Sequence, residues 1–331
     1  MAWIISDAVG TGEQGHAGDG GPALMALLNN PFDIAFTIDG DMIFSDTFNH
    51  CIRRVDFKTG SISNVTGTGE RGFAGDGGPA SAALLNEPYG VVVHRSGTIF
   101  FADRLNKRVR AIAPTGRIDT IAGDGSGQYS GDGGQAYLAG LAEPNGLTFD
   151  PAQSHLYIAD VADHRVRAVN LRTGIIQTVA GTGEAKHDGD GGPATQAGIF
   201  GARAVAFAPD GSLYVMERQG SSIRRIRDGI VETVAGTPIV RGYDGDGGDA
   251  GKAVFAAPKE MAVDTDGNIF VVDTENHAIR RIDAKTWTVD TIAGPSTGAG
   301  LGRPHGAAIG PDGAIYIGDS ETHRIRKLTW G

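Results

Sequence analysis

A unit of four short apolar runs recurs six times along this chain of 331 residues. In the third copy the runs read PNGLTFD, HLYIAD, HRVRAVN and TGIIQTVAG. Each run clusters or alternates β-branched and aromatic residues over a few positions, which predicts a strand. The breaks between runs carry Asp, Gly, Asn and Pro, which favour turns. One such unit would expose apolar side chains on both faces of a small sheet, so each sheet needs a neighbour on either side.

The copies are similar in length and are offset from the chain ends. Their first strands are predicted to begin near residues 31, 88, 144, 202, 258 and 304. The sixth copy stops at Trp330-Gly331 without a fourth run, whereas residues 3–12, WIISDAVGTG, match a fourth run. Closing the ring with this N-terminal strand removes the exposed edges of an open array. We therefore predict one all-β domain over residues 1–331, a six-bladed β-propeller of four-stranded antiparallel blades, with residues 3–12 completing the sixth blade.

Five of the six links between units contain the sequence GDGG. Its glycines permit positive φ, and we expect its Asp to accept backbone N–H bonds. The DGDG segments at Asp188–Gly191 and Asp244–Gly247 resemble part of a calcium loop, but they lack the terminal Glu and the full spacing of an EF-hand. A feature that recurs in five links is more simply explained by a backbone requirement. We predict that these loops are scaffold and that the protein uses no metal or other cofactor.

Composition and charge limit the expected partners and compartment. The formal net charge is −10 and the pI is about 5.3, so neither a nucleic acid nor an anionic membrane is an expected partner. The single cysteine, Cys51, excludes an internal disulfide and fits a reducing compartment; we expect it to be a small buried apolar group. No signal peptide or membrane-spanning run is evident, so we expect a soluble, cytoplasmic monomer.

The motifs quoted above, together with GDGGPA in the links, are similar to those of the NHL repeat, particularly its long bacterial form, and resemble the NHL domain of teneurins. The resemblance covers essentially the whole chain and implies a six-bladed propeller. Related propellers include amidating lyases, strictosidine-synthase-like proteins, lactonases, kinase sensor domains and RNA-binding proteins, so the resemblance implies no single function. The segment Glu143–Leu147 is similar to one that supplies a metal-binding Asn in gluconolactonase-like propellers, but counterparts of the other ligands are not evident.

The repeats provide an internal alignment in which unusual residues can be recognised. The position after the usual first-strand Pro holds Phe32, Tyr89, Asn145, Arg203, Lys259 and His305. Because the first strand of a propeller blade is innermost, we expect these side chains to surround the mouth of the central channel. Three consecutive copies place Arg, Lys and His there. Such clustering of cations costs stability unless an anion or a carboxylate compensates.

Other departures from the repeat supply candidate acids and bases. The position after this ring is normally Gly, but it is Asp33 in the first copy and Glu260 in the fifth, and the fourth copy has Glu217 where the others have Asp. Native sequences break their own pattern mostly at functional or strained sites. The predicted substrate-binding residues are Arg203, Lys259, Asn145, Phe32 and Asp33. The predicted catalytic residues are Glu217, Glu260, His305 and Tyr89.

Two functions are compatible with this channel mouth. The first is a small-molecule enzyme of the lyase or hydrolase type that acts on an anionic or carboxylate-bearing substrate. Arginine suits bidentate carboxylate recognition, and two acids near cations can hold different protonation states. The alternative is a non-catalytic NHL module that binds a ligand, a peptide or a protein on the same face. Aromatic residues make up only 7% of the chain, which favours the enzyme.

Overall fold

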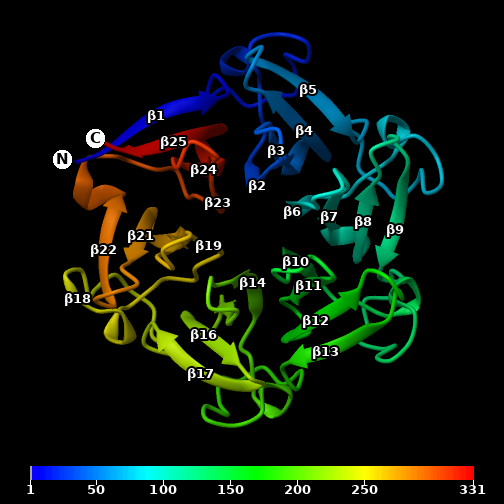
Figure 1. Cartoon of the computed structure of the whole chain (residues 1–331). Helices are drawn as coiled ribbons and strands as arrows, with labels where there is room; N and C mark the ends of the chain where they lie inside the picture. The colour runs from blue at the N-terminus through cyan, green and yellow to red at the C-terminus, as the bar shows by residue number, and fades with distance from the viewer. Residues whose placement is uncertain (1) are drawn as a thin grey trace.

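The computed structural model describes residues 2–331 and forms a closed ring of six antiparallel sheets (Figure 1). Blade 1 comprises β2 (Pro31–Phe36), β3 (Met42–Asp46), β4 (Cys51–Asp56) and β5 (Ser61–Thr66). Blade 2 comprises β6 (Pro88–Val93), β7 (Ile99–Asp103), β8 (Arg108–Ile112) and β9 (Ile118–Ala122). Blade 3 comprises β10 (Pro144–Phe149), β11 (His155–Asp160), β12 (Arg165–Asn170) and β13 (Ile176–Ala180). Blade 4 comprises β14 (Ala202–Phe207), β15 (Leu213–Glu217), β16 (Ser222–Arg227) and β17 (Ile230–Ala235).

The last two blades differ slightly from this pattern. Blade 5 comprises β19 (Glu260–Val263), β20 (Ile269–Asp273), β21 (Ala278–Ile282) and β22 (Thr288–Ala293), with the short β18 (Gly248–Asp249) added beside β22. Blade 6 comprises β23 (Gly306–Ile309), β24 (Ile315–Asp319), β25 (Arg324–Trp330) and β1 (Trp3–Val9). The register of β1 on β25 runs from Trp3 opposite Trp330 to Val9 opposite Ile325. The two ends of the chain therefore lie side by side (Figure 1). The predicted six-bladed fold and its closure by the N-terminal strand are confirmed.

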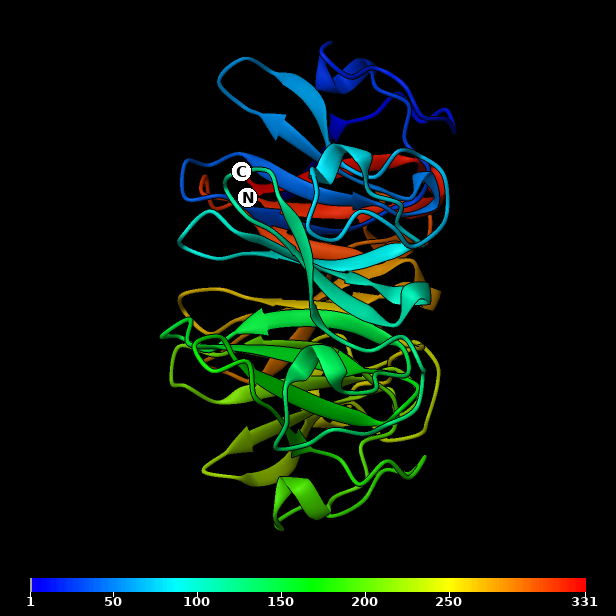
Figure 2. The ribbon, with the colours of Figure 1, turned by 90° about the vertical axis from the view of Figure 1, so that its right-hand side faces the viewer.

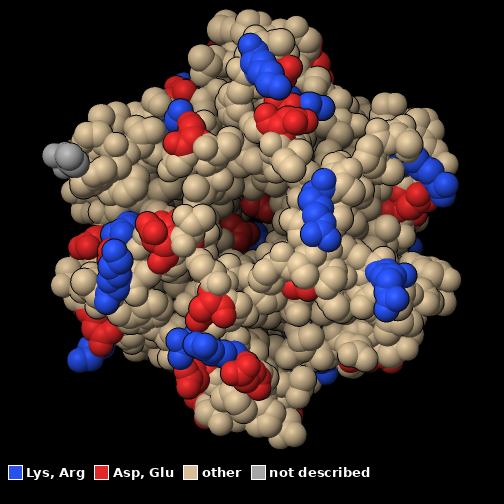
Figure 3. Space-filling view, in the orientation of Figure 1, with Lys and Arg blue, Asp and Glu red and all other residues tan. Residues whose placement is uncertain are grey.

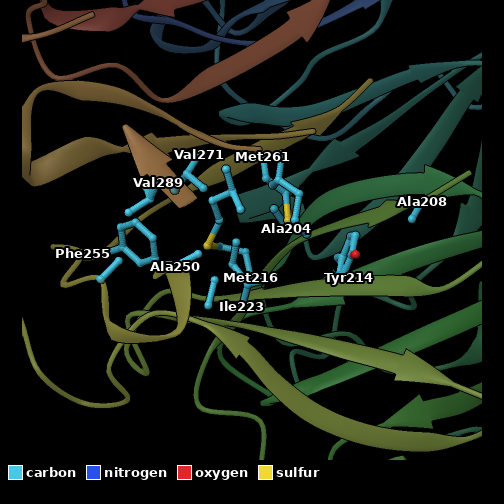
Figure 4. Packing of buried hydrophobic residues seen from close by; sticks show 14 residues of the cluster. Ala204, Ala208, Tyr214, Met216, Ile223, Ala250, Phe255, Met261, Val271 and Val289 are labelled. Carbon is cyan, nitrogen blue, oxygen red and sulfur yellow. The ribbon is translucent and has the colours of Figure 1, made fainter. Parts of the chain in front are cut away.

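The core is divided among the interfaces between blades. Seen on edge, the ring is a thick disc whose sheets stack around it (Figure 2). Between blades 4 and 5, Met216 and Ile223 pack with Phe255, Met261 and Val271, and all five are buried (Figure 4). Both faces of each sheet are covered in this way, which is why a single unit could not fold alone. No helix among residues 2–331 is both long and apolar enough to cross a membrane.

Short 3₁₀ turns connect the strands. Five lie in the links between blades: η1 (Ala23–Met25), η3 (Ala80–Ala82), η5 (Ala136–Leu138), η6 (Ala194–Gln196) and η7 (Ala250–Lys252). Four lie between second and third strands: η2 (Thr47–Asn49), η4 (Arg104–Asn106), η8 (Thr274–Asn276) and η10 (Ser320–Thr322). The link between blades 5 and 6 has η9 (Pro295–Thr297) instead of a GDGG loop.

Each of blades 1 to 5 buries one arginine of its third strand: Arg53, Arg110, Arg167, Arg224 and Arg280. In blade 2, Arg110 donates to Asp76 Oδ1 of the GDGG loop at 2.7 Å and to Asp103 Oδ2 at 3.3 Å. It also donates to the backbone oxygens of Leu84 and Ala74, each at 2.9 Å. Asp76 thus binds a guanidinium and the hydroxyl of Thr120, whereas Asp132 in the next link accepts the backbone N–H of Thr178 at 3.0 Å, as expected. Through Arg110, the GDGG loop is therefore connected to the second and third strands of blade 2.

Candidate functional site

A cavity of about 300 Å³ lies at the mouth of the central channel. All six ring residues line it: Phe32, Tyr89, Asn145, Arg203, Lys259 and His305. They converge because each occupies the same place on the innermost strand of its blade. Figure 3, viewed from the opposite face, shows that the centre of the ring is hollowed there as well, with acidic and basic side chains visible inside the opening. The sequence alignment of the repeats therefore located the cavity wall correctly, while the roles of these residues stay predictions.

The cavity is cationic although the protein is acidic. Its wall carries five basic side chains: Arg104, Arg203, Arg218, Lys259 and Arg303. It carries only two acidic ones, Glu143 and Glu321, which are paired with Arg104 and Arg303. We call these two arginines the rim arginines. Glu87 and Glu275, outside the wall, also contact Arg104 and Arg303. Among residues 2–331, the wall cations without a carboxylate within 4.0 Å are therefore Arg203 and Arg218, and their charge favours an anion in the cavity.

Three of these cations were not predicted from the sequence. Arg104 and Arg218 directly follow the acidic residue at the end of the second strand, a position held by Thr, Val or Ser in the other four copies. Arg303 precedes the first-strand Pro of the sixth copy. The same internal alignment, applied to these two positions, would have found all three.

Arg203 is the central cation of the cavity. Its residue is only 5% exposed, and no carboxylate within residues 2–331 comes within 4.0 Å of its guanidinium. Its guanidinium carbon lies 5.0 Å from the centroid of the Tyr89 ring. Arg104 lies 4.4 Å from the centroid of the same ring. Burial lowers the pKa of Arg203, because desolvation penalises its charged form. A buried cation without a carboxylate is costly to keep, so an anion bound here would be favoured.

Lys259 and His305 form a second buried pair beside Arg203. The Nδ1–H of His305 donates to the backbone oxygen of Arg303 at 3.0 Å, which leaves Nε2 as an acceptor. Lys259 Nζ donates to that nitrogen at 2.8 Å. Desolvation, followed by the charges of Arg203 and Arg303, lowers the pKa of Lys259 to about 7. Desolvation and the charge of Lys259 also hold the pKa of His305 well below its usual value.

Phe32 fixes one face of the His305 ring. The two rings stack with their centroids 3.9 Å apart and their planes 7° apart, and Phe32 also meets Tyr89 edge to face at 4.6 Å. Asn145, 1% exposed, donates through Nδ2 to the backbone oxygen of Glu143 at 2.8 Å. These contacts orient the polar groups of the cavity before any ligand arrives.

Asp33 and Glu260 do not line the cavity; they lie one residue further along β2 and β19. Asp33 Oδ2 accepts the N–H of Val91 in blade 2 at 2.8 Å, and Glu260 Oε1 accepts the N–H of Met261 at 3.0 Å. Burial raises the pKa of Asp33 to about 6. Burial, and then the charge of Asp33, raises the pKa of Glu260 well above its usual value. Glu260 is buried and Asp33 half-buried, and the two acids lie near Arg203, whose charge opposes both pKa shifts.

Glu217 lies outside the cavity, and its prediction as a catalytic group at the channel mouth is corrected. Its side chain is 0% exposed at the end of β15. Oε1 accepts from Phe200 N at 2.8 Å and from Arg224 Nη1 at 3.2 Å. Oε2 accepts from Ser222 Oγ at 2.6 Å and lies 2.5 Å from His187 Nδ1. Glu217 replaces the structural Asp of the other blades, and its longer side chain contacts Ser222 and His187 where Asp103 of blade 2 accepts from Asn106.

The cavity does not fit a divalent metal. Its carboxylates, Glu143 and Glu321, are engaged by Arg104 and Arg303. Among residues 2–331, no three His, Cys, Asp or Glu side chains gather so that they could hold a metal ion. In one DGDG segment, Asp188 is paired with Lys186 and Asp190 with Arg224.

A larger depression of about 770 Å³ lies between blades 2 and 3, lined in part by His94, Arg95, Tyr137 and Arg172. Similar grooves lie between blades 5 and 6 and between blades 6 and 1, and another lies on blade 3, so such depressions follow from the blade geometry. We place the functional site in the smaller cavity, because buried charged side chains from several blades converge only there among the described pockets.

The fold and the cavity define a six-bladed β-propeller with a cationic channel mouth, and its repeats are of the NHL type. The model of the family described as NHL repeat matches residues 255–282 and 301–328, within blades 5 and 6. The protein SUPPRESSOR OF QUENCHING 1, chloroplastic, of Arabidopsis thaliana is 26% identical over 270 residues, covering 78% of this chain and 25% of that protein. Teneurin-1 of Gallus gallus is 30% identical over 253 residues, covering 67% and 9%. The predicted resemblance to NHL repeats and to the teneurin NHL domain is confirmed, and the match spans a quarter or less of these relatives.

Solved structures with low identity share the fold. An auxiliary nutrient binding protein from Bacteroides thetaiotaomicron aligns with a TM-score of 0.72 and 16% identity, covering 99% of this chain and 76% of that one. Virginiamycin B lyase from Staphylococcus aureus aligns with a TM-score of 0.61 and 14% identity, covering 99% and 100%. A gluconolactonase from Xanthomonas campestris aligns with a TM-score of 0.62 and 13% identity, covering 98% and 89%. A lyase, a hydrolytic enzyme and a binding protein thus share this architecture.

Proposed function

We propose that the channel mouth binds a small carboxylate-bearing molecule and that the protein is an enzyme of the lyase or hydrolase type. The observation that carries this proposal is the position of Arg203, a buried cation that lines the cavity without a carboxylate partner. An arginine fork matches the two oxygens of a carboxylate, and charge-assisted bonds of this kind are among the strongest in proteins. The rim arginines, which are paired with glutamates, would steer the anion towards Arg203.

The groups beside Arg203 supply acid–base chemistry near neutral pH. His305 is neutral and has an accepting Nε2, and Lys259, with a pKa of about 7, can hold or release a proton at that pH. Tyr89, whose pKa is raised by burial, stays protonated and can donate a hydrogen bond. Because Glu217 lies outside the cavity, we assign the proposed proton transfer to Lys259 and His305. The lyase and gluconolactonase neighbours support an enzyme only through their shared fold.

The proposal is tested by replacing Arg203 with methionine, which keeps an unbranched side chain but removes the charge. Binding of small carboxylates such as glyoxylate, oxalate and benzoate is measured by calorimetry in the wild type and in the variant. We expect Arg203→Met to weaken binding by about 1.5–3 kcal/mol, or roughly 10- to 100-fold. Lys107→Met, at a third-strand turn off the cavity, is the matched control and should bind like the wild type. Equal binding by Arg203→Met and the wild type would refute the proposal.

The alternative is a non-catalytic module that binds its ligand on the same face. The nutrient-binding neighbour and the teneurin relative favour it, as does the loss of Glu217 from the site. The two functions are separated by incubating the protein with 2-oxo acids, hydroxy acids, lactones and esters and following product formation by NMR. An enzyme gives turnover that Lys259→Met or His305→Gln abolishes, whereas a module gives saturable binding without turnover.

A further inference from the structure

Lys259 is more than a positive charge in the cavity wall. It is 5% exposed, lies beside Arg203 on the next blade, and donates to His305 Nε2 at 2.8 Å. That bond uses an N–H of the amine and leaves the nitrogen lone pair of the neutral form free. The exposed lysines Lys58, Lys252 and Lys285 lack such surroundings. A desolvated amine next to other cations is the arrangement that activates lysine as a nucleophile.

We propose that Lys259 forms an imine with the carbonyl carbon of a small 2-oxo acid whose carboxylate is held by Arg203. This rests on the proposed function, since it needs the same anion site, and it adds the substrate class and the nucleophile. A 2-oxo acid carries its carboxylate and its ketone or aldehyde on adjacent carbons. Arg203 and Lys259 hold equivalent positions on consecutive innermost strands, so one short molecule can meet both. The cavity of about 300 Å³ accommodates a molecule of this size.

The step balances with the groups present. The neutral Nζ attacks the carbonyl carbon, a C–N bond forms, and the π electrons of the carbonyl move to its oxygen. The nitrogen loses both of its protons, and each passes through His305 Nε2 to the former carbonyl oxygen. The first converts the alkoxide to a hydroxyl, and the second lets that hydroxyl leave as water while the nitrogen lone pair forms the C=N bond. The product is a C=N bond and one water molecule, with no change in oxidation state. His305 suits this relay because its Nδ1–H is held by the Arg303 carbonyl and its Nε2 faces Lys259.

The charges around Lys259 support its reactivity. Burial, and then the positive charges of Arg203, Arg303 and Arg218, lower the pKa of Lys259 to about 7. The only carboxylate within 4.0 Å of Nζ among residues 2–331 is Glu275, whose Oε1 is 3.5 Å away and is shared with Arg303 at 2.7 Å. At neutral pH a sizeable fraction of Lys259 is then unprotonated, whereas an ordinary lysine is almost wholly protonated.

The experiment incubates the whole protein at neutral pH with glyoxylate and cyanoborohydride, which reduces an imine to a stable secondary amine. Peptide mapping by mass spectrometry then locates the label, whose mass is that of glyoxylic acid less one oxygen atom. We expect one site, Lys259, to be labelled about 100-fold faster than the exposed lysines Lys58, Lys252 and Lys285. Because the mapping uses the wild type, it does not depend on a variant that folds. Lys259→Met, checked by circular dichroism, should lose the fast label.

Acetaldehyde, which lacks a carboxylate, separates imine formation from anion recognition. Arg203→Met should slow labelling of Lys259 by glyoxylate about tenfold or more, because it loses a charge-assisted bond, while labelling by acetaldehyde falls much less. Labelling confined to the exposed lysines would overturn the imine, and the proposed function would still stand if glyoxylate bound in an Arg203-dependent way. Labelling of Lys259 that did not depend on Arg203 or on the carboxylate would overturn both the 2-oxo acid and the proposed anion site.

Discussion

Replacing Arg203 with methionine should change the titration of Lys259 as well as anion binding. After desolvation, the charge of Arg203 is the largest influence that lowers the pKa of Lys259 from 10.5 to about 7. Two like charges about 6 Å apart repel each other by about 2–3 kcal/mol at an effective dielectric constant of about 20. That energy corresponds to about 2 pH units. Since methionine leaves the amine equally buried, we expect the pKa of Lys259 to rise by about one to two units and to remain below that of an exposed lysine.

The assay is NMR of the protein after reductive methylation with ¹³C-formaldehyde, which gives each lysine its own titrating signal. Lys259→Met identifies the Lys259 signal, and the exposed Lys285 provides the unperturbed reference in the same spectrum. Free Arg203→Met should be at least as stable as the wild type, because it removes a buried charge that has no carboxylate partner. A wild-type Lys259 that titrates with the exposed lysines, or a Lys259 pKa that does not move in Arg203→Met, would show that Arg203 does not depress this pKa.

Asp76→Ala should lower the free energy of unfolding by about 2 kcal/mol in urea titrations, less than for a wholly buried pair because Asp76 is one-third exposed. Calcium should not restore the lost stability, and an unchanged free energy of unfolding would contradict a stabilising ion pair between Asp76 and Arg110. Glu260→Gln should stabilise the protein at about pH 7 but not at about pH 4. The raised pKa of Glu260 means that the wild-type folded state loses stability as the pH rises above 4.5, and glutamine removes that loss. A variant that is less stable than the wild type at about pH 7 would show that Glu260 is ionised and paired in the folded state. Glu217→Gln should lower the melting temperature and leave carboxylate binding unchanged, and weakened binding in a folded variant would return Glu217 to the site. Deleting β1 should open blade 6 and cause aggregation or a large fall in melting temperature; an unchanged melting temperature would contradict closure of the ring.

The repeat made the architecture and the six ring positions predictable. Rotational symmetry brings equivalent first-strand positions to one axis, so Phe32 and Arg203 could be placed in one wall without knowing any side-chain contact. The location of the residues that follow the ring positions was harder to predict. Asp33 and Glu260 are one residue further along their strands, and that single step takes them out of the cavity wall.

Glu217 shows where a departure from the repeat misleads. It was unusual in the sequence, yet its Oε1 accepts a backbone N–H and holds Arg224, the functions that Asp103 performs for Asn86 and Arg110 in blade 2. Glu217 is one methylene longer than the Asp of the other blades but holds the same structural position at the end of the second strand.

The contact between Lys259 and His305 could not be predicted from the pattern either. Its geometry depends on the side-chain rotamers of both residues and on the Arg303 carbonyl that fixes the imidazole. Repeat spacing places the two residues on one arc but does not decide which atoms meet.

A crystal structure of the protein soaked with oxamate tests the central claim most directly. Oxamate has the carboxylate of a 2-oxo acid but an amide in place of the ketone, so it can occupy the site without forming an imine. We expect oxamate in the channel-mouth cavity, with its carboxylate within hydrogen-bond distance of the Arg203 guanidinium and its carbonyl towards Lys259 Nζ. A saturated crystal in which oxamate lies only on the outer surface, or in which Arg203 is paired with a carboxylate of the protein, would contradict it.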